Sequence, residues 1–162
     1  MTGLWTHRRG FVAMSASAYL ARGARAAEVG EPAPVDWGEP IRITDIRPGD
    51  WKIALLEGDP VFLRRRTWAQ IAAARATPLS QLPDPAADEE RAPGGEWLVV
   101  SGLCTHAACQ VQAGLGPYEG WQCFCHGSAY DLSGRVRQGP ARRNLPVIGH
   151  AIANGALVLR RS

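Results

Sequence analysis

The sequence predicts a single domain built mainly of β-strands. Short apolar runs of strand length are separated by Gly, Pro, Asn and Asp residues, whereas a clear helix signal occurs once. Hydrophobic residues form 46% of the 162-residue chain and charged residues 20%, which is typical of a globular protein with its own core. All four cysteines lie in one short segment. We therefore expect a local metal or redox site and not disulfides spread through the fold.

The charge balance argues against nucleic acid as a partner. The chain carries 18 basic and 15 acidic side chains, a net charge of +3, and no basic tract interleaved with aromatic residues. No apolar run approaches the roughly 20 residues that a membrane span needs. An ordinary integral membrane protein is therefore disfavoured.

Residues 1–26 are predicted to form a twin-arginine signal or a degenerate membrane anchor. They contain four arginines and no acidic residue, and Arg8-Arg9 precedes a modestly apolar run. Ala24-Arg25-Ala26 has the small-x-small form of a cleavage site. Residues 27–40 are rich in Pro and Gly, so they are predicted to be a linker or hinge.

The folded domain is predicted over residues 41–162 and begins with strands. Residues 41–44 alternate with strand period. Two apolar runs, 51–56 and 61–65, flank the turn-forming residues 57–60 and predict a hairpin.

The helix signal follows the hairpin. Thr67 and Gln70 form a capping box, which predicts one short helix over about residues 67–76. Residues 77–95, with four prolines, are predicted to be a long loop. The β-branched run 97–103 is predicted to be a buried strand that leads into the first cysteine.

The C-terminal part is predicted to end in a second hairpin. Residues 144–148 and 156–160 would be its strands, around the favoured turn sequence Asn154-Gly155. The run 64–66 of three arginines is predicted to be a solvated strand end, with a docking patch as the alternative. His150 is expected to be a surface or packing residue.

The chemistry is concentrated in residues 104–128. This segment reads C-T-H-A-A-C, thirteen residues, then C-F-C-H-G-S, so that Cys104, His106, Cys123 and His126 have the spacing C-x-H-x16-C-x2-H. Two thiolates and two imidazoles can bind zinc tetrahedrally, or a [2Fe–2S] cluster with cysteine on one iron and histidine on the other. Zinc fingers usually pair like ligands within a loop, whereas here each loop supplies one of each, which favours the cluster. A disulfide framework is the third interpretation, and it leaves both histidines unexplained.

These motifs resemble those of the Rieske iron–sulfur subunit of bacterial ubiquinol–cytochrome c reductase, the cytochrome bc complex. The usual family motifs are C-T-H-L-G-C and C-P-C-H-G-S-x-Y-D. The likeness continues in residues 58–67, 82–100 and 134–141, so it covers about residues 41–160. The resemblance implies a Rieske fold of stacked antiparallel sheets with a small cluster-binding subdomain over about residues 104–141.

The resemblance also implies a role for each residue of the motifs. Cys104 and Cys123 would bind the buried iron, His106 and His126 the outer iron, Cys109 and Cys125 would form a disulfide, and Ser128 and Tyr130 would donate hydrogen bonds to sulfur. Neutral imidazoles in place of two thiolates make such a cluster easier to reduce. Hydroxyl donors stabilise the reduced state further.

The function implied is that of an electron-transfer subunit, inactive alone, of a respiratory quinol–cytochrome c oxidoreductase. His126 would accept a hydrogen bond from ubiquinol and take a proton as the [2Fe–2S] cluster takes one electron, which then passes to a c-type cytochrome. The expected partners are the cytochrome b and c-type cytochrome subunits of a dimeric complex. The expected location is the periplasmic face of the bacterial inner membrane, with the head anchored or held by the complex.

Two alternatives and three departures accompany this interpretation. The short N-terminal apolar run favours, as the alternative, a soluble periplasmic Rieske subunit of another oxidoreductase, of arsenite-oxidase type. A Rieske ferredoxin of an oxygenase is disfavoured, because those modules usually lack the second cysteine pair. Ala107 stands where the family has leucine, Ala108 where it has glycine and Arg142 where it has proline. Docking and redox potential are expected to differ from the family norm at these positions.

Overall fold

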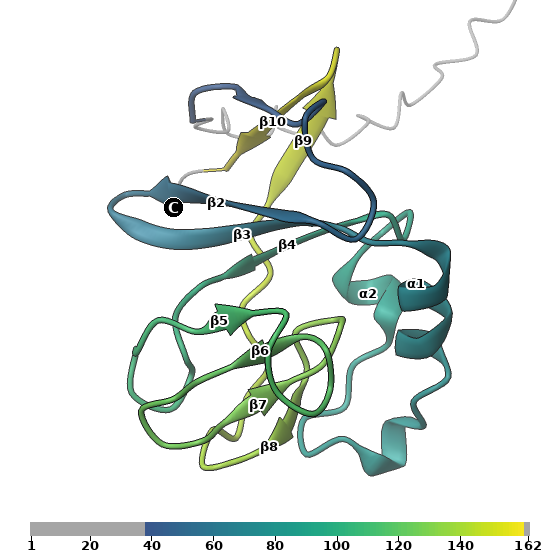
Figure 1. Ribbon diagram of the computed structural model, residues 1–162, viewed down its shortest axis with the longest axis vertical. Coiled ribbons are helices and arrows are strands. Elements are labelled where there is room, and N and C mark those ends of the chain that lie inside the picture. Colours follow the sequence, from purple (N-terminus) through teal and green to yellow (C-terminus); the bar gives the residue numbers. More distant parts are fainter. Residues whose placement is uncertain (1–37, 161–162) are drawn as a thin grey trace, which may run out of the picture. The chain divides into compact units, whose positions relative to one another are not determined.

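Three antiparallel sheets are stacked in the computed structural model, which describes residues 38–160 (Figure 1). The upper sheet has the order β1 (Ile41–Arg42), β10 (Ala156–Leu159), β9 (His150–Ala153). The middle sheet has the order β2 (Trp51–Leu56), β3 (Asp59–Arg65), β4 (Trp97–Ser101). The lower sheet runs β5 (Gln112–Ala113), β6 (Trp121–Gln122), β7 (Ala129–Tyr130), β8 (Val136–Gln138). The predicted mainly β fold is confirmed, and the predicted signal and most of the linker lie outside the described residues.

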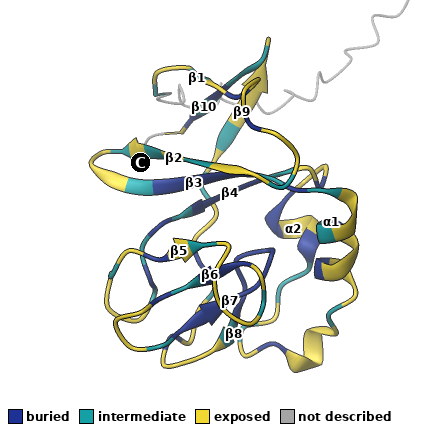
Figure 2. Cartoon of the chain, in the orientation of Figure 1, coloured by how far each residue is buried: buried dark blue, intermediate teal, exposed yellow. Residues whose placement is uncertain are grey.

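Strands β3 and β4 of the middle sheet are buried on both faces, whereas alternate residues of β2 are exposed. Alternate residues of β3 point to opposite sides, so Phe62 belongs to the hydrophobic core below the sheet and Leu63 to the core above it. In β4, Val100 and Val99 divide in the same way. Figure 2 shows these two strands as largely buried. Burial on both faces explains why the two strands read as continuous apolar runs in the sequence.

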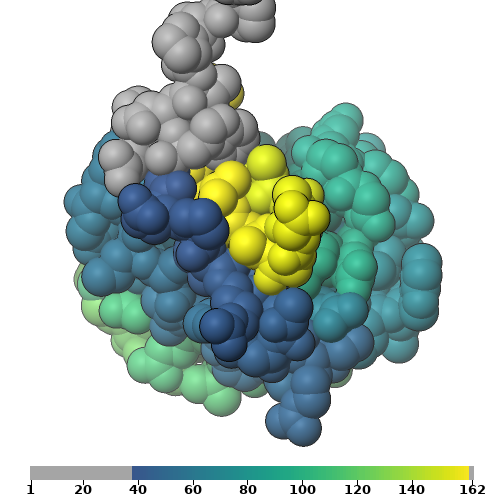
Figure 3. Space-filling model, turned by 90° about the horizontal axis from the view of Figure 1, so that it is seen from above, coloured from purple at the N-terminus to yellow at the C-terminus, as the bar shows by residue number. Residues whose placement is uncertain are grey.

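The two hairpins are closed by two-residue turns. Glu57 and Gly58 join β2 to β3, and Asn154 and Gly155 join β9 to β10; all four have positive φ. This backbone matches the twist of the flanking strands. Seen from above, the C-terminal strands lie between the segment that follows β1 and the helical segment (Figure 3).

The first strand of the C-terminal hairpin was predicted wrongly as residues 144–148. The strand is β9, and the earlier segment instead runs along the free edge of β4. There Val147 forms an isolated bridge with Val100, and the N–H of Ser101 donates to the carbonyl of Pro146 at 2.8 Å. These contacts cover an edge that would otherwise expose unpaired backbone groups.

Within the described residues two α-helices lie beside the sheets, whereas the sequence predicted one. Helix α1 (Trp68–Arg75) has the predicted capping box, with Thr67 as its N-cap and Gln70 completing the reciprocal pair. The second helix, α2 (Asp88–Arg91), lies within the predicted long loop, which also holds a 3-10 turn, η1 (Leu79–Gln81). None of the helices within residues 38–160 has the length and apolar character to cross a bilayer.

The run of three arginines is not a solvated strand end, which corrects that prediction. Arg64 and Arg66 are both 2% exposed. Arg66 forms a buried ion pair with Asp88 and donates to the carbonyl of Gly95 at 2.8 Å. Charges this deep require such partners, because desolvation without them is costly. The ion pair ties the end of β3 to helix α2.

Candidate metal centre

Two six-residue loops of the lower sheet carry the predicted ligands, and they share one backbone pattern. The first loop is residues 104–109 and the second is residues 123–128. In both, the N–H of the first residue donates to the carbonyl of the sixth, and the N–H of the fifth donates to the carbonyl of the first, at 2.8 or 2.9 Å. This pattern turns the chain back on itself, so each loop holds its ligands at one end of the subdomain.

The first residue of each loop is a buried free thiol. Cys104 is 3% exposed and Cys123 is 1% exposed, and neither is in a disulfide. Burial acts to raise the pKa of the Cys104 thiol, but hydrogen bonds from Tyr130 and from the backbone of His106 outweigh it, so its pKa is lowered. Burial and the neighbouring Cys104 raise the pKa of Cys123. Cys104 therefore opposes the ionisation of Cys123, and a bound cation would stabilise both as thiolates.

Tyr130 lies against the first of these thiols. Its hydroxyl oxygen is 3.3 Å from the sulfur of Cys104 and accepts a hydrogen bond from the N–H of Thr105 at 3.2 Å. Burial and the adjacent Cys104 raise the pKa of Tyr130, so its hydroxyl stays protonated near neutral pH. The hydroxyl can therefore donate to a thiolate at this position.

The two predicted histidine ligands lie together at the exposed end of the loops. The rings of His106 and His126 have centroids 4.7 Å apart and both residues are exposed. A disulfide joins Cys109 to Cys125 with a Cα–Cα distance of 6.6 Å, and so fastens the first loop to the second. The structure thus places the two predicted histidines side by side, the two free cysteines in contact with each other, and the other two cysteines in the predicted disulfide.

The donor set fits a two-iron cluster better than a single metal ion. Among the described residues, one group of three potential ligands has its donor atoms within 4.8 Å of one another, namely Cys109, Cys123 and Cys125. Two of these sulfurs are already bonded to each other, so this group is not a zinc site. The four free ligands instead divide into a buried thiol pair and an exposed imidazole pair. This division matches a cluster with cysteine on one iron and histidine on the other.

A third loop, residues 139–143, completes the site; in it only Arg142 stands out in the sequence, as a departure from the family pattern. The N–H of Ala141 donates to the hydroxyl oxygen of Ser128 at 2.9 Å. The hydroxyl of Thr105 donates to the carbonyl of Arg143 at 2.7 Å and lies 3.1 Å from that of Tyr130. The only sequence signal for a role of Thr105 is its place in the C-T-H motif. Its hydrogen-bonding partners, Tyr130 and Arg143, lie 25 and 38 residues away.

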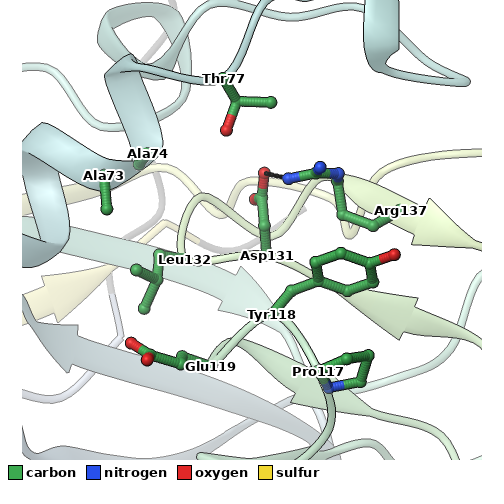
Figure 4. A pocket seen from close by; sticks show the side chains of 9 residues that line it. All are labelled: Ala73, Ala74, Thr77, Pro117, Tyr118, Glu119, Asp131, Leu132 and Arg137. Carbon is green, nitrogen blue, oxygen red and sulfur yellow. Dashed lines mark ion pairs between the residues drawn. The ribbon is translucent and has the colours of Figure 1, made fainter.

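A pocket of about 220 Å³ lies elsewhere, between α1, the segment before β6 and the end of β7 (Figure 4). None of the predicted ligands lines it. Arg137 lies over the ring of Tyr118, with 4.6 Å to the centroid, and pairs with Asp131 at 3.8 Å. The guanidinium in this pocket is therefore already partnered within the protein.

The fold and the loop pair define an iron–sulfur domain of the Rieske class. A family model described as "Rieske [2Fe-2S] domain" matches residues 37–149, and the chain belongs to this family, whose domain holds a [2Fe–2S] cluster. The ubiquinol-cytochrome c reductase iron-sulfur subunit of Rickettsia conorii is 48% identical over 109 residues, 66% of this chain and 62% of that protein. The mitochondrial cytochrome b-c1 complex subunit Rieske-1 of Nicotiana tabacum is 47% identical over 107 residues, 66% of this chain and 42% of that protein.

A solved structure shares the fold. The structure named "Hyperthermophilic respiratory Complex III" has a chain with a TM-score of 0.52 and 23% identity, over 73% of this chain and 71% of that chain. At this identity the likeness concerns the arrangement of the sheets and not the chemistry. The present chain spans less than two thirds of the length of its two relatives from Rickettsia and tobacco.

Replacing Ala108 by glycine is expected to stabilise the domain by roughly 0.5–1 kcal/mol, because a residue with a Cβ is strained in the left-handed backbone conformation. Glycine is more flexible than alanine in the unfolded chain, which offsets only part of this gain. Ala108 has φ +54° at the fifth position of the first loop, where the second loop has Gly127 with φ +83°. The midpoint of thermal unfolding of the cluster-loaded protein should rise. The control Ala107→Gly, at a position without positive φ, should lower it. Equal effects of both variants would contradict the assignment of strain to Ala108.

Proposed function

We propose that this protein is the iron–sulfur subunit of a quinol–cytochrome c oxidoreductase, which carries single electrons from ubiquinol to a c-type cytochrome. The proposal rests on how the ligands are arranged: a buried thiol pair lies at one end of the site, and an exposed pair of histidine rings, 4.7 Å apart, lies at the other. A redox partner can reach the exposed end, while the buried end excludes water. The subunit names of the Rickettsia and tobacco relatives support the same assignment.

Each ligand residue has a proposed role that follows from its position. Cys104 and Cys123 would hold one iron and His106 and His126 the other, and the bound cluster would store one electron. His126 would accept the hydrogen bond of the quinol hydroxyl and take its proton at the ring nitrogen that is free of iron. Being exposed at the end of the second loop, it can do so without a change in the buried thiol pair.

The proposed setting is the periplasmic face of a bacterial inner membrane, in a complex with cytochrome b and c-type cytochrome subunits. Residues 27–40 would form the linker on which the folded head, residues 41–162, moves between these partners. The soluble alternative of arsenite-oxidase type is not favoured, because the relatives are named as subunits of cytochrome bc complexes. N-terminal sequencing of the mature protein tests anchoring, since a start at Ala27 would exclude an anchor within residues 1–26.

Electron paramagnetic resonance of the purified full-length protein tests the proposed cluster directly. A high-potential cluster should be reduced by ascorbate and then give the Rieske-type signal. The assembled complex should reduce a c-type cytochrome with ubiquinol as donor. A colourless, zinc-loaded protein would rule out the cluster and the proposed function with it.

Replacing Tyr130 by phenylalanine is expected to lower the midpoint potential by roughly 60 mV, because a hydrogen bond to a charged acceptor is worth at least about 1.5 kcal/mol. The hydroxyl lies 3.3 Å from the sulfur of Cys104 and would favour the more negative, reduced state. Redox titration followed by electron paramagnetic resonance measures the shift. Tyr118→Phe is the matched control, since Tyr118 lies in the pocket beside Arg137 and not in the site. An unchanged midpoint potential in the Tyr130 variant would show that this hydroxyl does not tune the potential of the cluster.

A further inference from the structure

Three loops of the lower sheet form one connected surface, which we call the cluster tip: residues 104–109, 123–128 and 139–143. The disulfide joins the first loop to the second. The third loop is fastened to both, through the hydrogen bonds from Ala141 to Ser128 and from Thr105 to Arg143. The side chains that these loops expose are therefore held in fixed relation to His126.

The cluster tip has a distinctive charge. Its only formally charged residues are Arg142 and Arg143, and it contains no Asp or Glu. Both arginines are exposed, and neither forms an ion pair within residues 38–160. The carboxylate of Asp84 accepts a hydrogen bond from the N–H of the next residue, Asn144, and forms no ion pair with either arginine. Outside residues 1–26 the chain has nearly equal numbers of basic and acidic side chains, so two adjacent arginines without an acidic partner give the tip a local positive charge.

The cluster tip also exposes one large apolar side chain. Phe124 is 64% exposed, whereas Thr105, at the matching position of the first loop, is turned inward to hydrogen bonds. Ala107 and Ala108 add little apolar area. A partner that covered this ring would remove apolar surface from water, which would stabilise the contact.

We infer that the cluster tip docks through Arg142 and Arg143 onto an acidic surface around the haem edge of its electron acceptor, with Phe124 as the apolar anchor. The inference rests on the proposed function and names the chemistry of the partner. An aromatic centre with charged residues at the rim is the usual anatomy of a specific protein interface, in which aromatic and arginine side chains are enriched. Two unpaired cations next to the site fit an anionic partner and oppose a basic one.

The arginines and the phenylalanine have different expected effects. The arginine pair attracts an acidic protein at long range, so it raises the association rate and makes that rate sensitive to salt. Phe124 acts only at contact, because burying its ring stabilises the docked complex without a long-range force. In the docked complex one electron leaves the reduced cluster and converts the ferric haem of the acceptor to ferrous haem.

Stopped-flow kinetics with the ascorbate-reduced, cluster-loaded protein tests the inference. The acceptors are an acidic and a basic c-type cytochrome of similar potential. At low salt the acidic acceptor should react faster, and Arg142→Gln/Arg143→Gln should lower its rate constant about tenfold. Raising the salt from about 0.01 M to about 0.3 M should remove most of the difference between parent and double variant. Phe124→Ala should lower the rate while the salt dependence stays as in the parent.

Arg47→Gln is the control for loss of a surface arginine away from the tip, because Arg47 is exposed and pairs with Asp50 at 3.2 Å in the segment between β1 and β2. Its rate with the acidic acceptor should match that of the parent, and all variants should keep the parental midpoint potential. A double variant that reacts at the parental rate, or a parent that reacts faster with the basic cytochrome, would overturn the inference. The inference would also be overturned if the double variant lost binding to anionic phospholipid vesicles but kept the parental rate of electron transfer, because the surface would then face a membrane. Absence of the Rieske-type signal would instead defeat the proposed function.

Discussion

Replacing Cys104 by serine should leave the protein without its cluster, with iron per chain reduced at least about tenfold, since loss of even an outer partner of a metal ligand costs 10–100-fold in affinity. The thiol is buried and free, and it pairs with Cys123 to form the sulfur end of the proposed site. Serine cannot supply the soft thiolate that iron–sulfur clusters require. Iron analysis and electron paramagnetic resonance of the purified variant measure the loss.

The double variant Cys109→Ser/Cys125→Ser is the control, because it removes cysteine sulfurs from the same two loops, two of them where Cys104→Ser removes one. It keeps all four proposed ligands, so a Rieske-type signal should still form. The disulfide closes a loop with a sequence separation of 16, and its loss should lower the free energy of unfolding by about 3 kcal/mol. Equal iron loss in both variants, or full iron content in Cys104→Ser, would show that the four cysteines are wrongly divided into ligands and disulfide partners.

The second large effect is expected at the buried ion pair far from the loops. Asp88→Asn should lower the free energy of unfolding by about 3–5 kcal/mol, because it leaves Arg66 buried without a counter-charge. Both side chains of the pair are 0% exposed, and Asp88 also accepts from the hydroxyl of Ser133. Urea-induced unfolding, followed by circular dichroism, measures the change.

The pH dependence of stability gives an independent test of this ion pair. Burial acts to raise the pKa of Asp88, but hydrogen bonds from Arg66 and Ser133 and the charge of Arg66 outweigh it, so its pKa lies below the ordinary value of 3.8. A lowered pKa in the folded state contributes stability that is fully present above the unfolded-state pKa and is lost as the pH falls through the folded-state pKa. The parent should therefore lose this contribution below about pH 4. In Asp88→Asn the free energy of unfolding should lack this dependence on pH.

Glu89→Gln is the control for this pair of measurements. Glu89 is the next residue of α2 and pairs with Arg75 at 2.8 Å, but its side chain is 59% exposed. Exposed ion pairs contribute about 0–1 kcal/mol, so the control should be nearly neutral. A loss as large as that of Asp88→Asn would mean that the negative charge of helix α2, and not the buried pair, is responsible.

Local patterns predicted those elements whose causes are local. The helix α1 follows from Thr67 and Gln70, which lie three residues apart and hydrogen-bond to each other's backbone. The hairpin turn at Asn154 follows equally from two adjacent residues. The ligand spacing was also readable, because both ligands of each loop lie within four residues.

The errors occur where the partner lies far away in the sequence. The arginine run was assigned to solvent because Asp88, the partner of Arg66, is 22 residues away. The sequence pattern around Val147 favours a hairpin strand, but the pairing partner of Val147 is Val100 on β4. Helix α2 has only four residues and no side-chain hydrogen bond from its N-cap, so it was missed. The hydrogen bond between Thr105 and Arg143 spans 38 residues, and no short motif encodes it.

Strands β3 and β4 belong to two hydrophobic cores at once, and this governs how the domain opens. Loss of either neighbouring sheet would expose one whole face of these strands, so neither core can melt while the other keeps its full stability. The described domain is therefore expected to unfold cooperatively, with its slowest amide exchange in β3 and β4. A destabilising change in the upper sheet would thus shorten the lifetime of the cluster at the opposite end of the head.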